Sequence, residues 1–208
     1  MFVELIDRLR CPNDHEETWL VAAASRTENR RLIDATLGCP VCEAEFAVRD
    51  GVVAFGASVP SAPMPATEDE VMRAAALLHV QERGLYVLDA GWGSMGPGLL
   101  ALMSAEYLLV NPPAGINADE GVGILSAVGD RWPLAAASLQ GIALERATPA
   151  RLADAVRVLR PRGRLVAPSS APVPAGVAEL ARDDRHWVGE KVSDLVTLGR
   201  KKRSGASE

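Results

Sequence analysis

This sequence of 208 residues has little that would place it in a membrane or outside the cell. Its apolar runs are interrupted well before the roughly 18–20 residues that a transmembrane helix needs. The first ten residues, MFVELIDRLR, are amphipathic and lack the basic and then apolar order of a secretory signal peptide. The sequence therefore predicts a cytoplasmic protein with no membrane partner.

Cysteine is scarce, with only Cys11, Cys39 and Cys42 in the whole chain. An odd number of cysteines excludes a framework in which every thiol is paired in a disulfide. In a cytoplasmic protein, so few thiols are more typical of a metal site or of free cysteines.

Positive charge is also in deficit. The 22 lysine and arginine residues face 27 acidic residues, which gives a formal net charge of −5. Such a chain has no general attraction for phosphate backbones, so its composition does not favour nucleic acid as a partner. The composition is otherwise that of a globular protein, because 48% of the residues are hydrophobic and can form a sizeable core.

The composition changes near residue 56 and predicts two units. Residues 56–67 contain three prolines and no hydrophobic period, which is typical of a linker. We therefore expect a small cysteine-bearing domain at 1–55 and a larger domain at 68–200. The last residues, 201–208, are polar and predict a disordered tail.

The larger unit alternates short apolar strands with helices, which predicts an α/β fold with a doubly wound, mostly parallel, Rossmann-like sheet. Its first helix is expected at 68–83, with Gly84 as the C-cap, and its last two strands at 186–192 and 194–201. The small unit is expected to be α+β, with a helix followed by strands. Its predicted elements are a helix at 2–9, strands at 18–25 and 30–39, and a hairpin at 45–55.

A glycine turn follows the first strand of the larger unit, in the stretch VLDAGWGSMGPG. Gly91, Gly93 and Gly96 fit the pattern G-x-G-x-x-G, which allows a tight turn and a close backbone approach to a ligand. Alone the pattern is weak, and a turn without any ligand is a real alternative. A nicotinamide dinucleotide would need an acidic residue about 20 positions on, and Asn111 stands in that region.

The residues around this turn resemble class I S-adenosylmethionine-dependent methyltransferases over most of 68–200. VLDAGWGSMG resembles the first motif of that family, VGDRWPLAAASLQGIALE its third and fourth strand region, and LADAVRVLRPRGRLVAPSS its helix, turn and fifth strand. The resemblance implies S-adenosylmethionine as cofactor. The cofactor-binding residues that it implies are Asp89, Gly91, Gly93, Asn111, Asp130 and Trp132.

The sequence also departs from that family. Met95 stands where a glycine is common, Asn111 replaces an acidic residue, and the connection 111–120 is short and without helical period. No catalytic group is evident, and Asn-Pro-Pro at 111–113 follows the second strand, whereas in amide and adenine methyltransferases it follows the fourth. Two hypotheses therefore stand: a methyltransferase of unknown substrate, or a degenerate methyltransferase fold that acts as a binding or scaffolding subunit.

The cysteines are grouped as two knuckles, which predicts a zinc site. Cys39 and Cys42 form a C-x-x-C pair, and Cys11 with His15 supplies two more ligands. Asp14 is the alternative fourth ligand, but imidazole is the commoner partner of thiolates at zinc. A ribbon that has lost its metal is the other alternative.

Residues 1–55 resemble the small zinc-ribbon proteins that bind and activate methyltransferases of translation, on ELIDRLRCP and LGCPVCEAEFAVRDGVVAF. The resemblance implies that the ribbon stabilises the larger domain within one chain. It also implies a protein or a translation-related substrate as partner, while self-association stays open.

Overall fold

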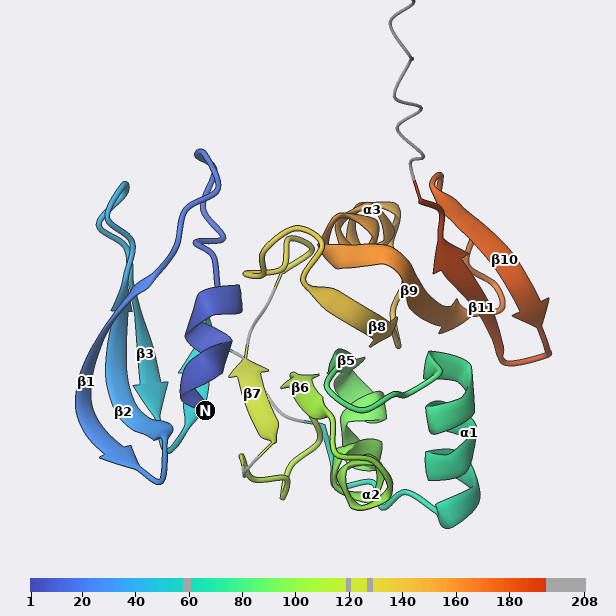
Figure 1. The fold of residues 1–208 in the computed structure, drawn as a ribbon, viewed down its shortest axis with the longest axis horizontal. Coiled ribbons are helices and arrows are strands. Elements are labelled where there is room, and N and C mark those ends of the chain that lie inside the picture. The colour runs from blue at the N-terminus through green and yellow to red at the C-terminus, as the bar shows by residue number, and fades with distance from the viewer. Residues whose placement is uncertain (58–60, 119–120, 127–128, 194–208) are drawn as a thin grey trace, which may run out of the picture.

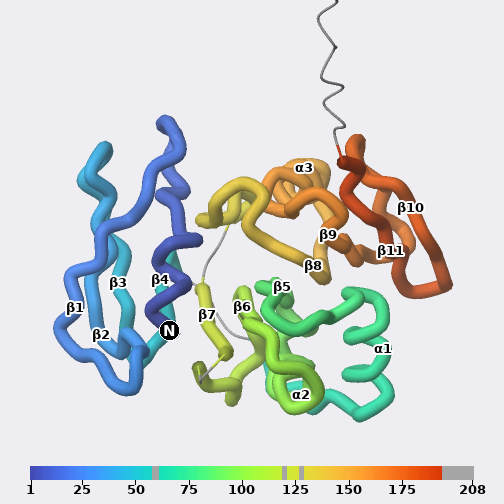
Figure 2. Tube along the Cα trace, viewed as in Figure 1, coloured from blue at the N-terminus to red at the C-terminus, as the bar shows by residue number. Residues whose placement is uncertain are grey.

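The structure is a computed structural model, and it describes residues 1–57, 61–118, 121–126 and 129–193. Eleven strands form one sheet in the order β1-β2-β3-β4-β7-β6-β5-β8-β9-β11-β10 (Figures 1 and 2). The strands are β1 Val21–Glu28, β2 Arg31–Gly38, β3 Glu45–Arg49, β4 Val52–Ala54, β5 Leu85–Asp89, β6 Glu106–Val110, β7 Val122–Ser126, β8 Leu139–Ala143, β9 Leu159–Pro168, β10 Val177–Arg182 and β11 His186–Lys191. The helices are η1 Val3–Arg8, α1 Glu68–Leu78, η2 Ala90–Met95, α2 Gly96–Leu102 and α3 Pro149–Val158, where η marks a 3-10 helix.

The middle of the sheet is parallel and its two ends are antiparallel. Strands β4, β7, β6, β5, β8 and β9 pair in parallel, whereas β1 to β4 form a meander and β11 lies antiparallel between β9 and β10. This arrangement confirms the α/β, Rossmann-like class. Strand β5 pairs with β6 on one side and with β8 on the other, so the order of the strands reverses between β5 and β8. In open α/β sheets, ligands bind beyond the carboxyl ends of the strands at such a reversal.

Both faces of the central strands are buried, which explains why these strands are apolar without alternation. In β5, Leu85 and Val87 pack in the same core as Leu152 of α3. Tyr86 and Leu88 point to the other face and pack in the core formed with α1 and α2. Successive side chains of a strand point to opposite faces, so two helical layers need an apolar residue at every position.

The cysteine-bearing unit continues the central sheet. Strand β4 pairs in parallel with β7, with Val52 opposite Ile124 and Val53 opposite Leu125. Helix η1 lies over the same face as α3, and a side chain on Gly123 of β7 would meet Leu5 at 3.1 Å. The division into two domains stays a prediction, but the sheet runs without a break from one predicted unit into the other.

Most predicted elements are confirmed, and the end of the first helix is wrong. Helix α1 begins at the predicted residue, Glu68. Thr67 caps it, because the Thr67 hydroxyl accepts the Glu70 amide while the Glu70 carboxylate accepts the Thr67 amide. It ends at Leu78 and not at residue 83, because His79 adopts a left-handed conformation with φ of 50°. Its N–H then bonds the Ala76 carbonyl, which closes the helix one turn early.

The C-terminal strands match in part. The predicted strand at 186–192 is β11, and its neighbours are β9 and β10. Strand β10 was missed, since VAELAR is largely exposed and lacks the apolar run of the central strands. The other predicted strand, 194–201, and the tail 201–208 lie outside the described residues. In the described part of the chain, none of the helices combines the length and the apolar character needed to cross a membrane.

The packing of η1 on the sheet predicts that the N-terminal unit unfolds together with the rest. Leu5 is fully buried, so Leu5→Ala should lower the free energy of unfolding by about 2–5 kcal/mol. Leu180→Ala is the control, because Leu180 is 49% exposed and its truncation should change stability by less than about 0.5 kcal/mol. Urea unfolding followed by circular dichroism measures both, and a separate early transition in the Leu5 variant would contradict this account.

Candidate functional site

The two predicted knuckles meet at one end of the meander. The ligand atoms of Cys11, His15, Cys39 and Cys42 all lie within 4.8 Å of one another. Cys11 precedes β1, while Cys39 and Cys42 lie in the turn between β2 and β3. The pairing of β1 with β2 and of β2 with β3 therefore brings Cys11 and Cys42, 31 positions apart in the sequence, to one point, as the knuckle spacing predicts.

Two distances within this cluster match those of a tetrahedral zinc site. With Zn–S bonds of about 2.3 Å and Zn–N bonds of about 2.0 Å, tetrahedral geometry needs S···S near 3.8 Å and S···N near 3.5 Å. Cys11 Sγ lies 3.7 Å from Cys42 Sγ, and Cys39 Sγ lies 3.4 Å from His15 Nε2. The cluster could thus hold a zinc ion with His15 as the fourth ligand. Asp14, the alternative, is not part of the cluster.

Groups around the cluster orient its ligands. His15 Nδ1 donates to the carbonyl of Glu16 at 2.6 Å, so Nε2 keeps its lone pair toward the thiols. Asn13 Nδ2 donates to Cys42 Sγ at 3.3 Å. The Ala44 amide, followed by Asn13, lowers the pKa of Cys42 to about 6, and burial raises the pKa of Cys11 to about 12. The thiolate that binds metal is therefore favoured at Cys42, whereas Cys11 needs a cation to ionise.

The glycine turn lies at the carboxyl end of β5, as predicted, but it forms the 3-10 helix η2 before α2 begins. The Gly91 N–H donates to the Glu145 carboxylate, and Met64 also lies against this glycine. A side chain on Gly93 would meet Pro112 Cβ at 2.8 Å. Gly91 and Gly93 thus allow close approach of the chain's own groups.

Asp89, the last residue of β5, forms a buried ion pair. Its Oδ1 lies 2.8 Å from Arg151 Nη2, and the two side chains are 4% and 12% exposed. Its Oδ2 accepts the Glu145 amide at 3.3 Å. Burial raises the pKa of Asp89 above its ordinary value, and the Arg151 guanidinium opposes that rise. Both carboxylate oxygens are therefore engaged within the chain.

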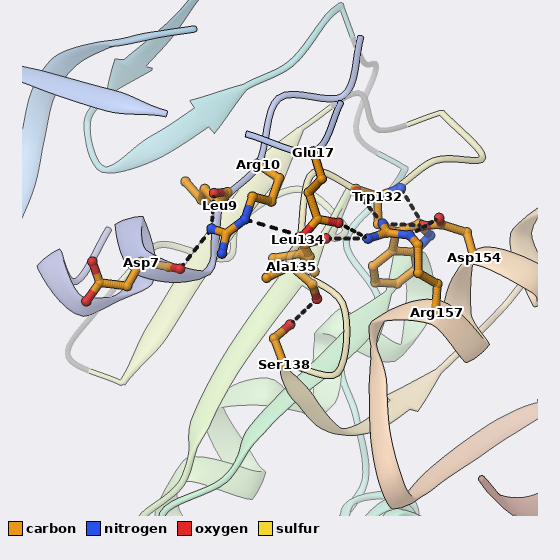
Figure 3. Close-up of polar contacts among 10 residues, drawn as sticks. All are labelled: Asp7, Leu9, Arg10, Glu17, Trp132, Leu134, Ala135, Ser138, Asp154 and Arg157. Atoms are coloured by element: carbon orange, nitrogen blue, oxygen red, sulfur yellow. Dashed lines mark hydrogen bonds and ion pairs between the residues drawn. The ribbon is translucent and has the colours of Figure 1, made fainter. Parts of the chain in front are cut away.

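Trp132 lies on the other side of Arg151, whose guanidinium carbon is 5.3 Å from the centre of its ring. The ring is 1% exposed, so it packs in the core and does not flank an open cavity. Figure 3 shows the contacts that fix this loop. Arg157 donates to the carbonyls of Trp132 and Leu134, and it pairs with Asp154 at 2.7 Å and with Glu17 of the N-terminal unit at 3.1 Å.

The last two predicted cofactor residues lie apart from the turn. Asp130 is exposed and accepts the Thr148 hydroxyl at 3.1 Å, near the start of α3. Asn111 follows β6 with φ of 48° and lines a different cavity, with Val52 and Ile124. Arg151 therefore contacts both Asp89 and Trp132. By contrast, Gly91, Asn111 and Asp130 line three separate cavities.

The cavity beside the glycine turn has a volume of about 190 Å³. It is lined by Met64, Arg73, Gly91, Trp92, Glu145 and His186, among others. Arg151 and Glu145 were not among the predicted site residues; Glu145 is exposed just after β8, and Arg151 lies in α3. Their places in the chain could have indicated both residues. Glu145 follows β8, the strand beside β5, and Arg151 lies in the first turn of α3, the next helix.

Comparison with known proteins gives structural matches only. No family model matches the chain, and no curated protein matches it. A complex that contains a methyltransferase activator of Haloferax volcanii matches with a TM-score of 0.40 and 18% identity, over 46% of this chain and 49% of that one. A geranyl diphosphate methyltransferase with S-adenosylmethionine gives 0.38 and 20%, over 47% and 48%. Phosphoethanolamine N-methyltransferase 2 of Haemonchus contortus gives 0.42 and 13%, over 50% and 28%. The chain spans half or less of each of these structures.

The geometry of the knuckles predicts about one zinc ion per chain. His15→Ala should lower the zinc content and the melting temperature, because it removes one of four converging ligands. His79→Ala is the matched control, since His79 lies outside the cluster at the end of α1. Elemental analysis of freshly purified protein checks this, and equal zinc content in the two variants would show that His15 is not a ligand.

Proposed function

We propose that this chain is a degenerate methyltransferase fold, stapled by zinc, which acts as a binding or scaffolding subunit. The observation that carries the proposal is the separation of the predicted cofactor contacts into different cavities. The cavity at Gly91, of about 190 Å³, is smaller than the roughly 300 Å³ at which pockets for drug-sized ligands begin.

The internal contacts at the end of β5 support the same conclusion. Asp89, which the family resemblance assigns to the start of the cofactor loop, is paired with Arg151 in a buried site. Removing one partner of such a pair is strongly destabilising, because a charge is left buried without compensation. Asp89 thus has a structural role that competes with a ligand.

The zinc cluster gives this fold a structural rather than a catalytic metal. Three cysteines and one histidine fill the four positions of a tetrahedral ion, which leaves none open for a water or a substrate. The cluster also holds the meander whose last strand, β4, extends the central sheet.

A methyltransferase is the second candidate, and one observation favours it. The glycine turn stands at the carboxyl end of β5, next to the point where the strand order reverses, which is where α/β sheets bind ligands. In that case the exposed Glu145 would leave the Gly91 amide when the cofactor binds.

Calorimetric titration of the zinc-loaded protein with S-adenosylmethionine and S-adenosylhomocysteine separates the two candidates. We expect no binding up to millimolar ligand, because Asp89, Gly91 and Trp132 are engaged within the chain. We also expect none for Glu145→Gln, which weakens the contact to Gly91 and leaves the ion pair of Asp89 with Arg151 in place. Saturable binding at micromolar ligand would support the methyltransferase, and binding confined to Glu145→Gln would locate the block at that one carboxylate.

A further inference from the structure

Another cavity, of about 350 Å³, lies at the opposite end of β5 from the glycine turn. It is bounded by the end of α1 at His79, by Tyr86 and Gln140 near the starts of β5 and β8, and by residues 160–164 of β9. Its volume falls in the range of pockets that hold small ligands. Since β5, β8 and β9 are parallel, this cavity is separated from the glycine turn by the length of the strands.

Three arginines line this cavity in an otherwise acidic chain. Arg160, Arg162 and Arg164 face one carboxylate, that of Glu190. Glu190 lies 3.8 Å from Arg162 and 3.6 Å from Arg164, so it is shared between two guanidinium groups at more than hydrogen-bond distance. Arg160 has no ion pair with any residue in the described ranges. The cavity therefore keeps an excess of two positive charges.

The backbone holds Arg162 in this place under strain. The start of β9 departs from regular pairing, since Leu139 lies opposite Leu159 but Gly141 lies opposite Arg164. Within this bulge Arg162 has φ of 65°, in the left-handed region that glycine adopts at no steric cost. Its side chain is 80% exposed and gains little from packing. Burial of the side chain therefore does not offset the unfavourable backbone conformation of Arg162.

We propose that this cavity binds a small phosphate ester, with Arg160 and Arg162 as the principal contacts. Guanidinium groups donate pairs of hydrogen bonds that match phosphate oxygens, and two uncompensated positive charges suit a dianion. Gln140 also lines the cavity, with its carboxamide beside Gly84.

Titration calorimetry of the full chain with inorganic phosphate and pyrophosphate tests the site directly. We expect saturable binding of both, weaker at higher ionic strength because part of the attraction is electrostatic. Arg162→Gly should weaken phosphate binding about tenfold, since it removes a charged hydrogen-bond donor. The same variant should raise the melting temperature, because glycine adopts the left-handed conformation without strain.

Arg30→Gly is the matched control. Arg30 is also left-handed, with φ of 60°, and its side chain is 79% exposed, but it lies in the turn between β1 and β2. The control should also lose a charge while phosphate affinity stays unchanged. Equal losses of affinity in both variants, no phosphate binding at all, or binding of an RNA oligonucleotide without binding of phosphate would each overturn the proposal.

Discussion

The buried ion pair between Asp89 and Arg151 fixes the carboxyl end of the central strand against α3. Arg151 stacks on Trp132, and the Trp132 loop is in turn bonded to Asp154 and Arg157 of the same helix. Desolvation makes such a pair costly to open once it is formed. An α/β sheet ordinarily binds its ligand at this end of the strands. Here the end of β5 instead stabilises the folded protein through its contact with α3.

The N-terminal unit is stabilised by the same sheet. A unit of 55 residues buries too little apolar surface to be stable alone, and two further interactions stabilise it here. One is the Cys11, His15, Cys39 and Cys42 cluster, and the other is the parallel pairing of β4 with β7 under η1. Without β4, β7 would be an edge strand with unpaired backbone groups; β4 covers that edge within one chain.

The sequence predicted the elements well where local chemistry sets them. The start of the first helix at residue 68, the hairpin at 45–55 and the C-x-x-C knuckle each depend on a few neighbouring residues, so their pattern is visible in the sequence. The filled glycine turn was not predictable, because it depends on Glu145 and Arg151, which reach it from more than 50 positions away. The β4 to β7 pairing was missed for the same reason.

The hydrogen bond of the Gly91 amide distinguishes a glycine turn filled by Glu145 from one that is open to a cofactor. The resonance of this amide can be followed by nuclear magnetic resonance while S-adenosylhomocysteine is added to the zinc-loaded protein. We expect the resonance to move on Glu145→Gln, which alters the acceptor of its hydrogen bond, and to stay in place up to millimolar ligand. A resonance that ignores the substitution and shifts with saturation as the ligand is added would contradict this expectation.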